Sequence, residues 1–207
     1  MTMIKICGLF RECDIDHVNE AQPDYIGFIL HFPKSHRNVS VETAAVLRNR
    51  LKPGIKAVGV FVDQTAETVL QTSAAVHLDV IQLHGHEEND YILHLKEQTD
   101  LPVWKAFRIR NQDDLKAAEN SAADEILLDN GYGTGQAFDW SLASGFTRPF
   151  ILAGGLTPEL IPDALKMTGV KLIDISSGVE TDRVKDRNKI IAAVKAAHGT
   201  AEKEGTR

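Results

Sequence analysis

Short runs of β-branched and other apolar residues alternate with stretches of helical periodicity along the whole chain. This pattern predicts eight strands: Met3–Cys7, Tyr25–Leu30, Ala57–Val62, Val80–His84, Val103–Arg108, Glu125–Asp129, Phe150–Ala153 and Lys171–Ile175. It also predicts eight helices: Glu12–Ala21, Val41–Leu51, Ala66–Ser73, Glu87–Gln98, Asp113–Asn120, Asp139–Ser144, Pro158–Met167 and Asp186–His198. Capping residues Ser40, Thr65 and Thr157 precede three of these helices and support their starts.

Strands that alternate with helices pair in parallel through right-handed crossovers. The two candidate architectures are an open doubly wound sheet and a closed (β/α)8 barrel. Eight units in 207 residues match a compact barrel, and a closed ring leaves no edge strand. We therefore predict an α/β fold, a single-domain (β/α)8 TIM barrel over residues 1–198. The polar residues 199–207 lack periodicity and are expected to form a disordered tail.

Composition narrows the class of protein further. With 43% apolar and 25% charged residues the chain is globular, and its net charge of −6 argues against coating of nucleic acids. Apolar runs such as Ala57–Val62 are too short to span a membrane, and acidic residues soon after Phe10 leave no room for a signal peptide. Cys7 and Cys13 make neither a disulfide framework nor a zinc motif. We expect a cytoplasmic protein with no nucleic-acid or membrane partner.

The carboxyl ends of the barrel strands are where an active site is expected. Lys5 and Cys7 alternate onto the inward face of the first strand, where Cys7 is either a small buried apolar side chain or a reactive thiol. Asp129 ends the sixth strand, where it either begins an Asx turn or serves as a general acid. The two lie three strands apart around the ring, which suits a base and an acid on opposite sides of a substrate.

Two glycine clusters follow the seventh and eighth strands, at Gly154-Gly155 and Ser177-Gly178. Either alone is compatible with a simple turn, but together they predict backbone N–H groups that bind a phosphate. The ligand is then a phosphosugar or a similar compound. Arg37, in the loop after the second strand, is either a solvated cation or the planar partner of a substrate carboxylate.

Other polar residues face inward as well. His84-Gly85-His86 lacks further ligands at a suitable spacing, so His84 is interpreted as an inward polar residue and no metal is predicted. No dinucleotide or Walker fingerprint is present, and we predict no cofactor. Asp174 in the last strand is expected to pair with Lys5, because that strand closes onto the first. The Lys5 ammonium is also expected to lower the pKa of Cys7.

The ordered set of motifs resembles the phosphoribosylanthranilate isomerase family of tryptophan biosynthesis, from Met3 to about Ala197. The motifs are Lys5-Ile6-Cys7-Gly8, Ser35-His36-Arg37, Val58-Gly59-Val60-Phe61-Val62, Gln82-Leu83-His84-Gly85, Leu127-Leu128-Asp129, Gly133-Thr134-Gly135, Phe138-Asp139-Trp140, Ala153-Gly154-Gly155-Leu156 and Asp174-Ile175-Ser176-Ser177-Gly178-Val179-Glu180. Two motifs depart from the family pattern: Tyr132 replaces the first glycine of a G-G-T-G loop, and His36 replaces a proline. Without that proline Arg37 is expected to be more mobile in the absence of ligand.

The resemblance implies a cofactor-free Amadori rearrangement of N-(5-phosphoribosyl)anthranilate to 1-(2-carboxyphenylamino)-1-deoxyribulose 5-phosphate. It implies that Cys7 is the general base at C2 and that Asp129 is the general acid at the ring oxygen. The residues predicted to bind the substrate are Arg37, His84, Gly154, Gly155, Asp174, Ser177 and Gly178. Arg37 matches the position that engages the anthranilate carboxylate.

Three alternatives compete with this interpretation. A related isomerase of the histidine pathway would want an aspartate at position 7, and an indole-glycerol-phosphate synthase would want an extra N-terminal segment and inward lysines. The third is a barrel that binds a phosphosugar without turning it over. The sequence leaves both a monomer and a homodimer open.

Overall fold

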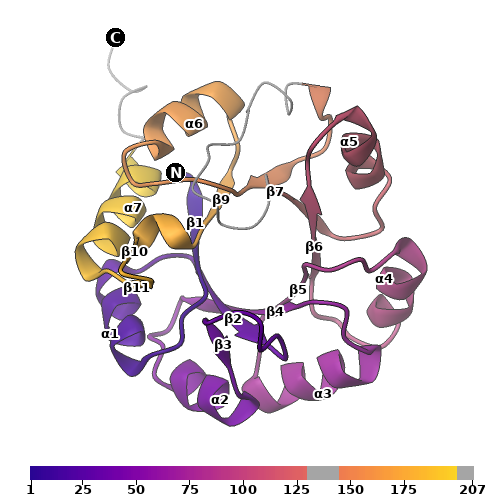
Figure 1. The fold of residues 1–207 in the computed structure, drawn as a ribbon, viewed down its shortest axis with the longest axis horizontal. Helices are drawn as coiled ribbons and strands as arrows, with labels where there is room; N and C mark the ends of the chain where they lie inside the picture. Colours follow the sequence, from indigo (N-terminus) through magenta and orange to yellow (C-terminus); the bar gives the residue numbers. More distant parts are fainter. Residues whose placement is uncertain (130–144, 200–207) are drawn as a thin grey trace.

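The computed structural model describes residues 1–129 and 145–199, and eight parallel strands close into a barrel. They are β1 (Met3–Cys7), β2 (Tyr25–Leu30), β4 (Lys56–Phe61), β5 (Val80–Leu83), β6 (Val103–Arg108), β7 (Glu125–Asp129), β8 (Phe150–Leu152) and β9 (Leu172–Ile175). Their order is β1-β9-β8-β7-β6-β5-β4-β2, and pairing of β2 with β1 closes the ring (Figure 1). The predicted closed barrel is confirmed.

Helices surround the ring of strands (Figure 1). Those in the described ranges are α1 (Glu12–Ala21), α2 (Val41–Asn49), α3 (Ala66–Val76), α4 (Asn89–Lys96), α5 (Gln112–Glu119), α6 (Ile161–Thr168) and α7 (Arg187–Gly199). The helix predicted at Asp139–Ser144 lies outside the described residues, and so does the tail beyond Gly199. None of the helices in the described ranges has the length and apolar character that a membrane crossing requires.

Side-chain caps start two of the helices as predicted. Ser40 Oγ accepts from Thr43 N at 3.1 Å, and Thr65 Oγ1 accepts from Thr68 N at 3.2 Å. The expected start of α6 after Thr157 is wrong by three residues. A turn comes first, in which Leu160 N donates to Thr157 O at 3.0 Å, and the helix begins only at Ile161.

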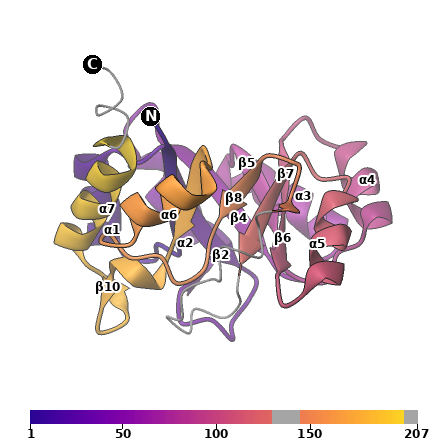
Figure 2. The same cartoon turned by 90° about the horizontal axis from the view of Figure 1, so that it is seen from above.

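Several short elements were not predicted. β3 (Asn38–Val39) pairs with β2, and after the 3-10 turn η2 (Ser177–Val179) the chain forms an antiparallel hairpin of β10 (Glu180–Thr181) and β11 (Val184–Lys185). Two-residue strands are too short to show a periodicity. Figure 2 shows β10 at the end of the barrel opposite the N-terminus. The hairpin therefore lies at the carboxyl ends of the strands.

The apolar core has two parts. Inward side chains, among them Val58, Trp104, Leu127 and Ile151, fill the barrel itself. A larger set packs between the strands and the helices. Because side chains alternate along each strand, the two faces of every strand contribute to different parts of the core. The barrel interior is thus a packed support for the residues at its rim.

Candidate active site

Cys7 and Asp129 are the last residues of β1 and β7. Cys7 is 7% exposed, and the Asp129 side chain is 15% exposed. Only β9 and β8 separate the two strands in the ring, so the predicted spacing of three strands is confirmed. A thiol and a carboxyl therefore stand at the same end of the barrel, both largely shielded from water.

The predicted ion pair between Lys5 and Asp174 is confirmed inside the barrel. Lys5 is fully buried, and its Nζ lies 3.0 Å from both carboxylate oxygens of Asp174. The two residues are register partners across β1 and β9. Gly27 on β2 leaves room for the neighbouring side chains, since a Cβ there would lie 2.8 Å from Cys7 Sγ and 3.2 Å from Lys5 Nζ. The thiol and the ammonium thus lie side by side.

Burial raises the pKa of the Cys7 thiol, and this effect outweighs the lowering by the Lys5 ammonium beside it. Lys5 acts in the expected direction, but the expected net lowering of the pKa is wrong. The physical reason is that the thiolate loses almost all of its hydration at this position. In the absence of ligand, Cys7 is therefore a neutral thiol at neutral pH.

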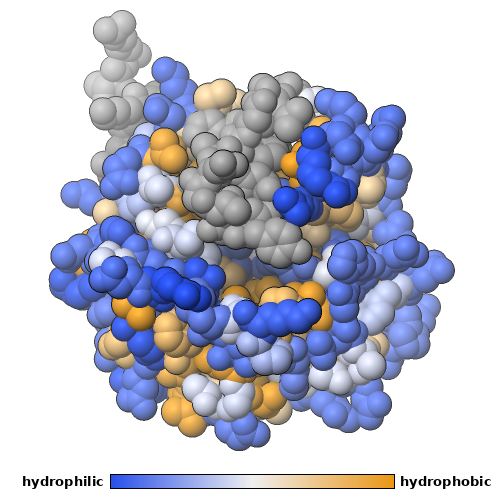
Figure 3. All heavy atoms as spheres, viewed as in Figure 1, coloured by the Kyte–Doolittle hydropathy of each residue, from blue (hydrophilic) through white to orange (hydrophobic). Residues whose placement is uncertain are grey.

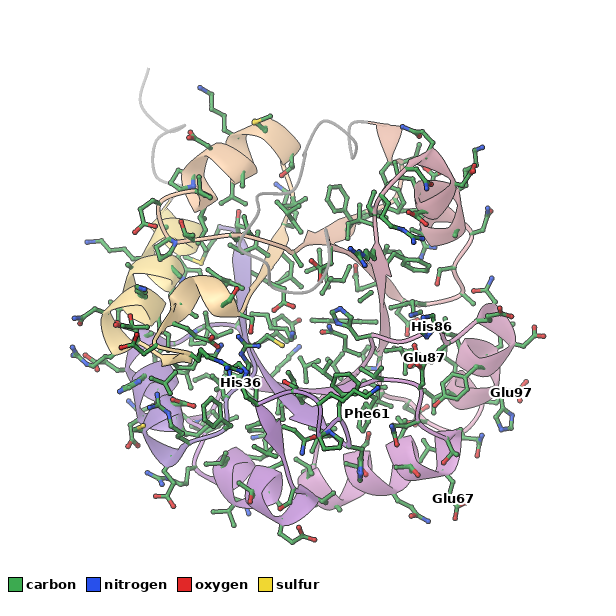
Figure 4. All side chains as sticks on the ribbon, in the orientation of Figure 1. His36, Phe61, Glu67, His86, Glu87 and Glu97 are labelled. Atoms are coloured by element: carbon green, nitrogen blue, oxygen red, sulfur yellow. The ribbon has the colours of Figure 1, made fainter. Side chains whose placement is uncertain are left out.

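His84 joins Asp129 at the rim. His84 Nε2 lies 3.5 Å from Asp129 Oδ2, and Gln82 Nε2 lies 3.2 Å from His84 Nδ1. When the Gln82 amide donates to Nδ1, the proton of the neutral ring sits on Nε2 and faces the carboxylate. The turn after His84 is fixed by Glu87, which accepts from Gly85 N and pairs with buried Lys105 (Figure 4).

Arg37 is held by a carboxylate of the chain itself. Its Nε and Nη2 donate to Oε1 and Oε2 of Glu180 at 2.6 and 2.7 Å. The same carboxylate pairs with buried Lys185 at 2.7 Å. His36, which precedes Arg37 in the chain, contacts the hairpin at Arg183. Its Nε2 lies 3.2 Å from the Arg183 carbonyl oxygen (Figure 4). The structure shows Arg37 anchored by Glu180, and the mobility expected from the missing proline stays a prediction.

Sequence reasoning missed this anchor. In the sequence Glu180 stands only at the end of a motif, and nothing marks Lys185 as a functional residue. No periodicity marks Lys185, because it belongs to a two-residue strand. The single hint in the sequence is that two cations, Arg183 and Lys185, follow shortly after a motif that ends in Glu180.

The two predicted phosphate loops follow neighbouring strands and contact each other. Gly154 and Gly155 have φ of +87° and +67°, in the left-handed region that favours glycine. A Cβ on Gly178 would lie 1.8 Å from the Leu156 carbonyl oxygen, so only glycine allows this close approach. Ser177 begins the 3-10 turn beside it. The structure thus brings together the four residues predicted to bind phosphate.

No group of three or more potential metal-binding side chains occurs within residues 1–129 and 145–199. His86 faces Asp63, with Nδ1 3.0 Å from Oδ2, and its side chain is 95% exposed (Figure 4). His84 and His86 therefore have different partners.

A cavity of about 1060 Å³ lies at the opposite end of the barrel. It is lined by the first residues of several strands, including Met3, Tyr25, Lys56 and Leu172. Because chemistry in this fold belongs to the carboxyl ends, we do not assign this cavity to the active site. Figure 3, seen from the carboxyl end, shows hydrophilic residues next to apolar ones on this face of the barrel.

Comparisons with known proteins agree with this geometry. Residues 4–196 match the family model of N-(5'phosphoribosyl)anthranilate (PRA) isomerase. The N-(5'-phosphoribosyl)anthranilate isomerase of Caldanaerobacter subterraneus subsp. tengcongensis is 42% identical over 206 residues, covering 96% of this chain and 99% of the relative.

Two solved structures are similar over nearly the full length. A phosphoribosyl anthranilate isomerase in complex with reduced 1-(o-carboxyphenylamino)-1-deoxyribulose 5-phosphate has a TM-score of 0.86 at 34% identity, covering 96% of this chain and 100% of its own. Monomers of the dimeric enzyme from Thermotoga maritima give 0.85 at 35% identity, with the same coverage. The chain therefore belongs to the N-(5'-phosphoribosyl)anthranilate isomerase family.

Proposed function

We propose that this chain isomerises N-(5-phosphoribosyl)anthranilate to 1-(2-carboxyphenylamino)-1-deoxyribulose 5-phosphate in tryptophan biosynthesis, with Cys7 as general base and Asp129 as general acid. Membership of the family supports the substrate. The observation that carries the assignment of roles is the thiol and the carboxyl at the same rim, three strands apart. No cofactor is needed, because the reaction only moves protons and electron pairs within the substrate.

The reaction proceeds through an open-chain intermediate. Asp129 donates a proton to the furanose ring oxygen as the C1–O bond breaks, which leaves a Schiff base at C1. Cys7 thiolate removes the proton from C2, and the electron pair of the C–H bond forms an enolamine. Tautomerisation places a proton on C1 and removes one from the C2 hydroxyl, which gives the ketose. Substrate and product have the same atoms and the same overall oxidation state.

The surroundings of Cys7 supply what a thiol base needs. Lys5 and Lys185 both favour the thiolate electrostatically, against the penalty of burial. The thiolate forms as a minor species at neutral pH, and the stronger basicity that accompanies a raised pKa partly offsets its low population. His84 Nε2–H, directed at Asp129, stabilises the carboxylate that remains after proton donation.

The other predicted residues bind the ends of the substrate. Gly154, Gly155, Ser177 and Gly178 hold the phosphate through backbone N–H groups, and Arg37 holds the anthranilate carboxylate. Asp174 supports the site from within the barrel through its pair with Lys5. All of these residues come from one chain, so a monomer and a homodimer would both contain them.

The decisive experiment follows the fluorescence of the anthranilate-type substrate. We expect the signal to decay when the protein is added, and expect Cys7→Ala and Asp129→Asn each to lower kcat by at least about 100-fold with little change in KM. Cys13→Ala is the matched control, because Cys13 is exposed on α1 and should leave the rate unchanged. Binding of the phosphosugar without decay would instead identify a non-catalytic barrel.

A further inference from the structure

A chain of hydrogen bonds joins Arg37 to the backbone of Cys7 through the β10–β11 hairpin. Glu180 accepts from Arg37 and from Lys185, whose Nζ also donates to the Ser176 carbonyl at 3.0 Å. Ser176 Oγ in turn donates to the Cys7 carbonyl at 3.0 Å. The hairpin therefore connects the proposed carboxylate anchor to the strand end that carries the proposed base.

Glu180 is a fixed member of this chain. Its side chain is 6% exposed, and Oε1 accepts from both Arg37 and Lys185. Burial alone would raise the pKa of Glu180, but the hydrogen bonds and charges of Arg37 and Lys185 lower it to about 2. A carboxylate held by two cations stays ionised and in place. A carboxylate that stays in place can position Arg37. A carboxylate that merely occupied the place of the substrate carboxylate would be displaced when the substrate binds.

The contact also determines which edge of the Arg37 guanidinium is left for a ligand. Glu180 occupies the edge formed by Nε and Nη2. The aliphatic part of Arg37 lies over Gly8, where a Cβ would come within 2.5 Å of Arg37 Cδ. Nη1 has no partner among the residues that the structure describes. The edge formed by Nη1 and Nη2 thus remains for a second carboxylate.

We infer that Glu180 is a positioning residue that holds Arg37 with the edge formed by Nη1 and Nη2 toward the substrate. Glu180 thereby makes the site selective for an arylamine that carries a carboxylate. This inference rests on the proposed function. Glutamine at position 180 would break the arrangement, because its amide offers one acceptor oxygen, whereas the two cations need two. Its NH2 group would then face a donor of Arg37 or of Lys185.

The test compares two ligands by isothermal titration calorimetry. One is reduced 1-(o-carboxyphenylamino)-1-deoxyribulose 5-phosphate, and the other is the same compound without the carboxyl group. We expect Glu180→Gln to weaken binding of the first about tenfold, as for loss of a charge-assisted hydrogen bond, and binding of the second less than about twofold. Glu20→Gln is the matched control, since Glu20 pairs with Arg187 between α1 and α7 and should change neither affinity.

Three results would overturn the inference: equal weakening of both ligands, no change in either, or tighter binding of the carboxylate ligand. The last would make Glu180 a competitor of the substrate. Circular dichroism checks that Glu180→Gln folds. If it does not, Glu180→Asp, which keeps the charge, takes its place. Glu180→Asp should weaken binding of the carboxylate ligand only.

Arg37→Ala separates this inference from the proposed function. Loss of discrimination in Arg37→Ala together with its retention in Glu180→Gln would reject only the role of Glu180. If Arg37→Ala still favours the carboxylate ligand, the assignment of Arg37 itself fails, and the role of Glu180 fails with it. Turnover by the wild-type protein tests the isomerase activity independently of both.

Discussion

Replacing Asp174 with asparagine would leave a fully buried ammonium without a counter-charge. At the 3.0 Å separation of Lys5 Nζ and the carboxylate, the Coulomb attraction is about 5.5 kcal/mol for an effective dielectric constant of about 20. Asparagine keeps the size of the side chain and one acceptor oxygen, so part of the contact survives. Breaking one side of a buried pair typically costs about 3–5 kcal/mol. We expect Asp174→Asn to lower the free energy of unfolding by about 3–5 kcal/mol. The total for a domain is typically about 5–15 kcal/mol.

Urea unfolding followed by circular dichroism at neutral pH measures this loss. Asp113→Asn is the control, because Asp113 and Lys116 form an exposed pair whose side chains are 89% and 71% exposed, and it should change stability by less than about 0.5 kcal/mol. The double variant Lys5→Met/Asp174→Leu removes both charges and should recover most of the loss. A cost for Asp174→Asn no larger than that of the control would refute the reasoning. So would a double variant as unstable as the single one.

Three further predictions concern pH and loop geometry. Because burial raises the pKa of Cys7 and the base must be ionised, kcat/KM should rise with pH above neutrality, and Lys5→Met should move this rise to higher pH in the measured profile; an unchanged profile would exclude Lys5 from tuning the thiol. The folded-state pKa of Glu180, about 2, lies below its ordinary value of 4.5, so its ionised form stabilises the fold above about pH 4.5, and this contribution is lost as pH falls toward 2. Urea midpoints of wild type and Glu180→Gln should therefore converge in acid, and a constant difference would contradict the assignment. Gly178→Ala would force the loops after β8 and β9 apart, because its Cβ would overlap the Leu156 carbonyl oxygen, and it should raise KM about tenfold or more in steady-state assays, whereas Gly145→Ala, at an open position, should not.

The barrel was predictable because each unit of the chain repeats one strong pattern. The bounds of β1 and β2 agree with the prediction to the residue. The predicted start of α6 was wrong because Thr157-Pro158 has the sequence of an N-cap followed by a first helical residue, whereas in the structure it begins a turn. The β10–β11 hairpin gave no signal, since its turn residues Asp182 and Arg183 adopt φ of +50° and +65° without a glycine.

The site was predictable only as far as strand topology determines it. Closure of the last strand onto the first is enough to pair Lys5 with Asp174. The partner of Arg37 lies 143 residues away on an element with no local pattern, so only the folded structure shows it. Likewise the net direction of the Cys7 pKa depends on how deeply the thiol is buried, and a sequence gives only the charges nearby.

Lys5 has two roles, one in the stability of the barrel and one in catalysis. As the buried partner of Asp174 it braces the ring, and as the neighbour of the thiol it favours the reactive ionised form. Replacing this pair with aliphatic side chains would recover most of the stability that Asp174→Asn loses, but it would also remove the ammonium that favours the thiolate and so lower turnover. Substitutions that aim to raise the stability of this barrel should therefore be placed in its outer helices and should leave Lys5 and Asp174 unchanged.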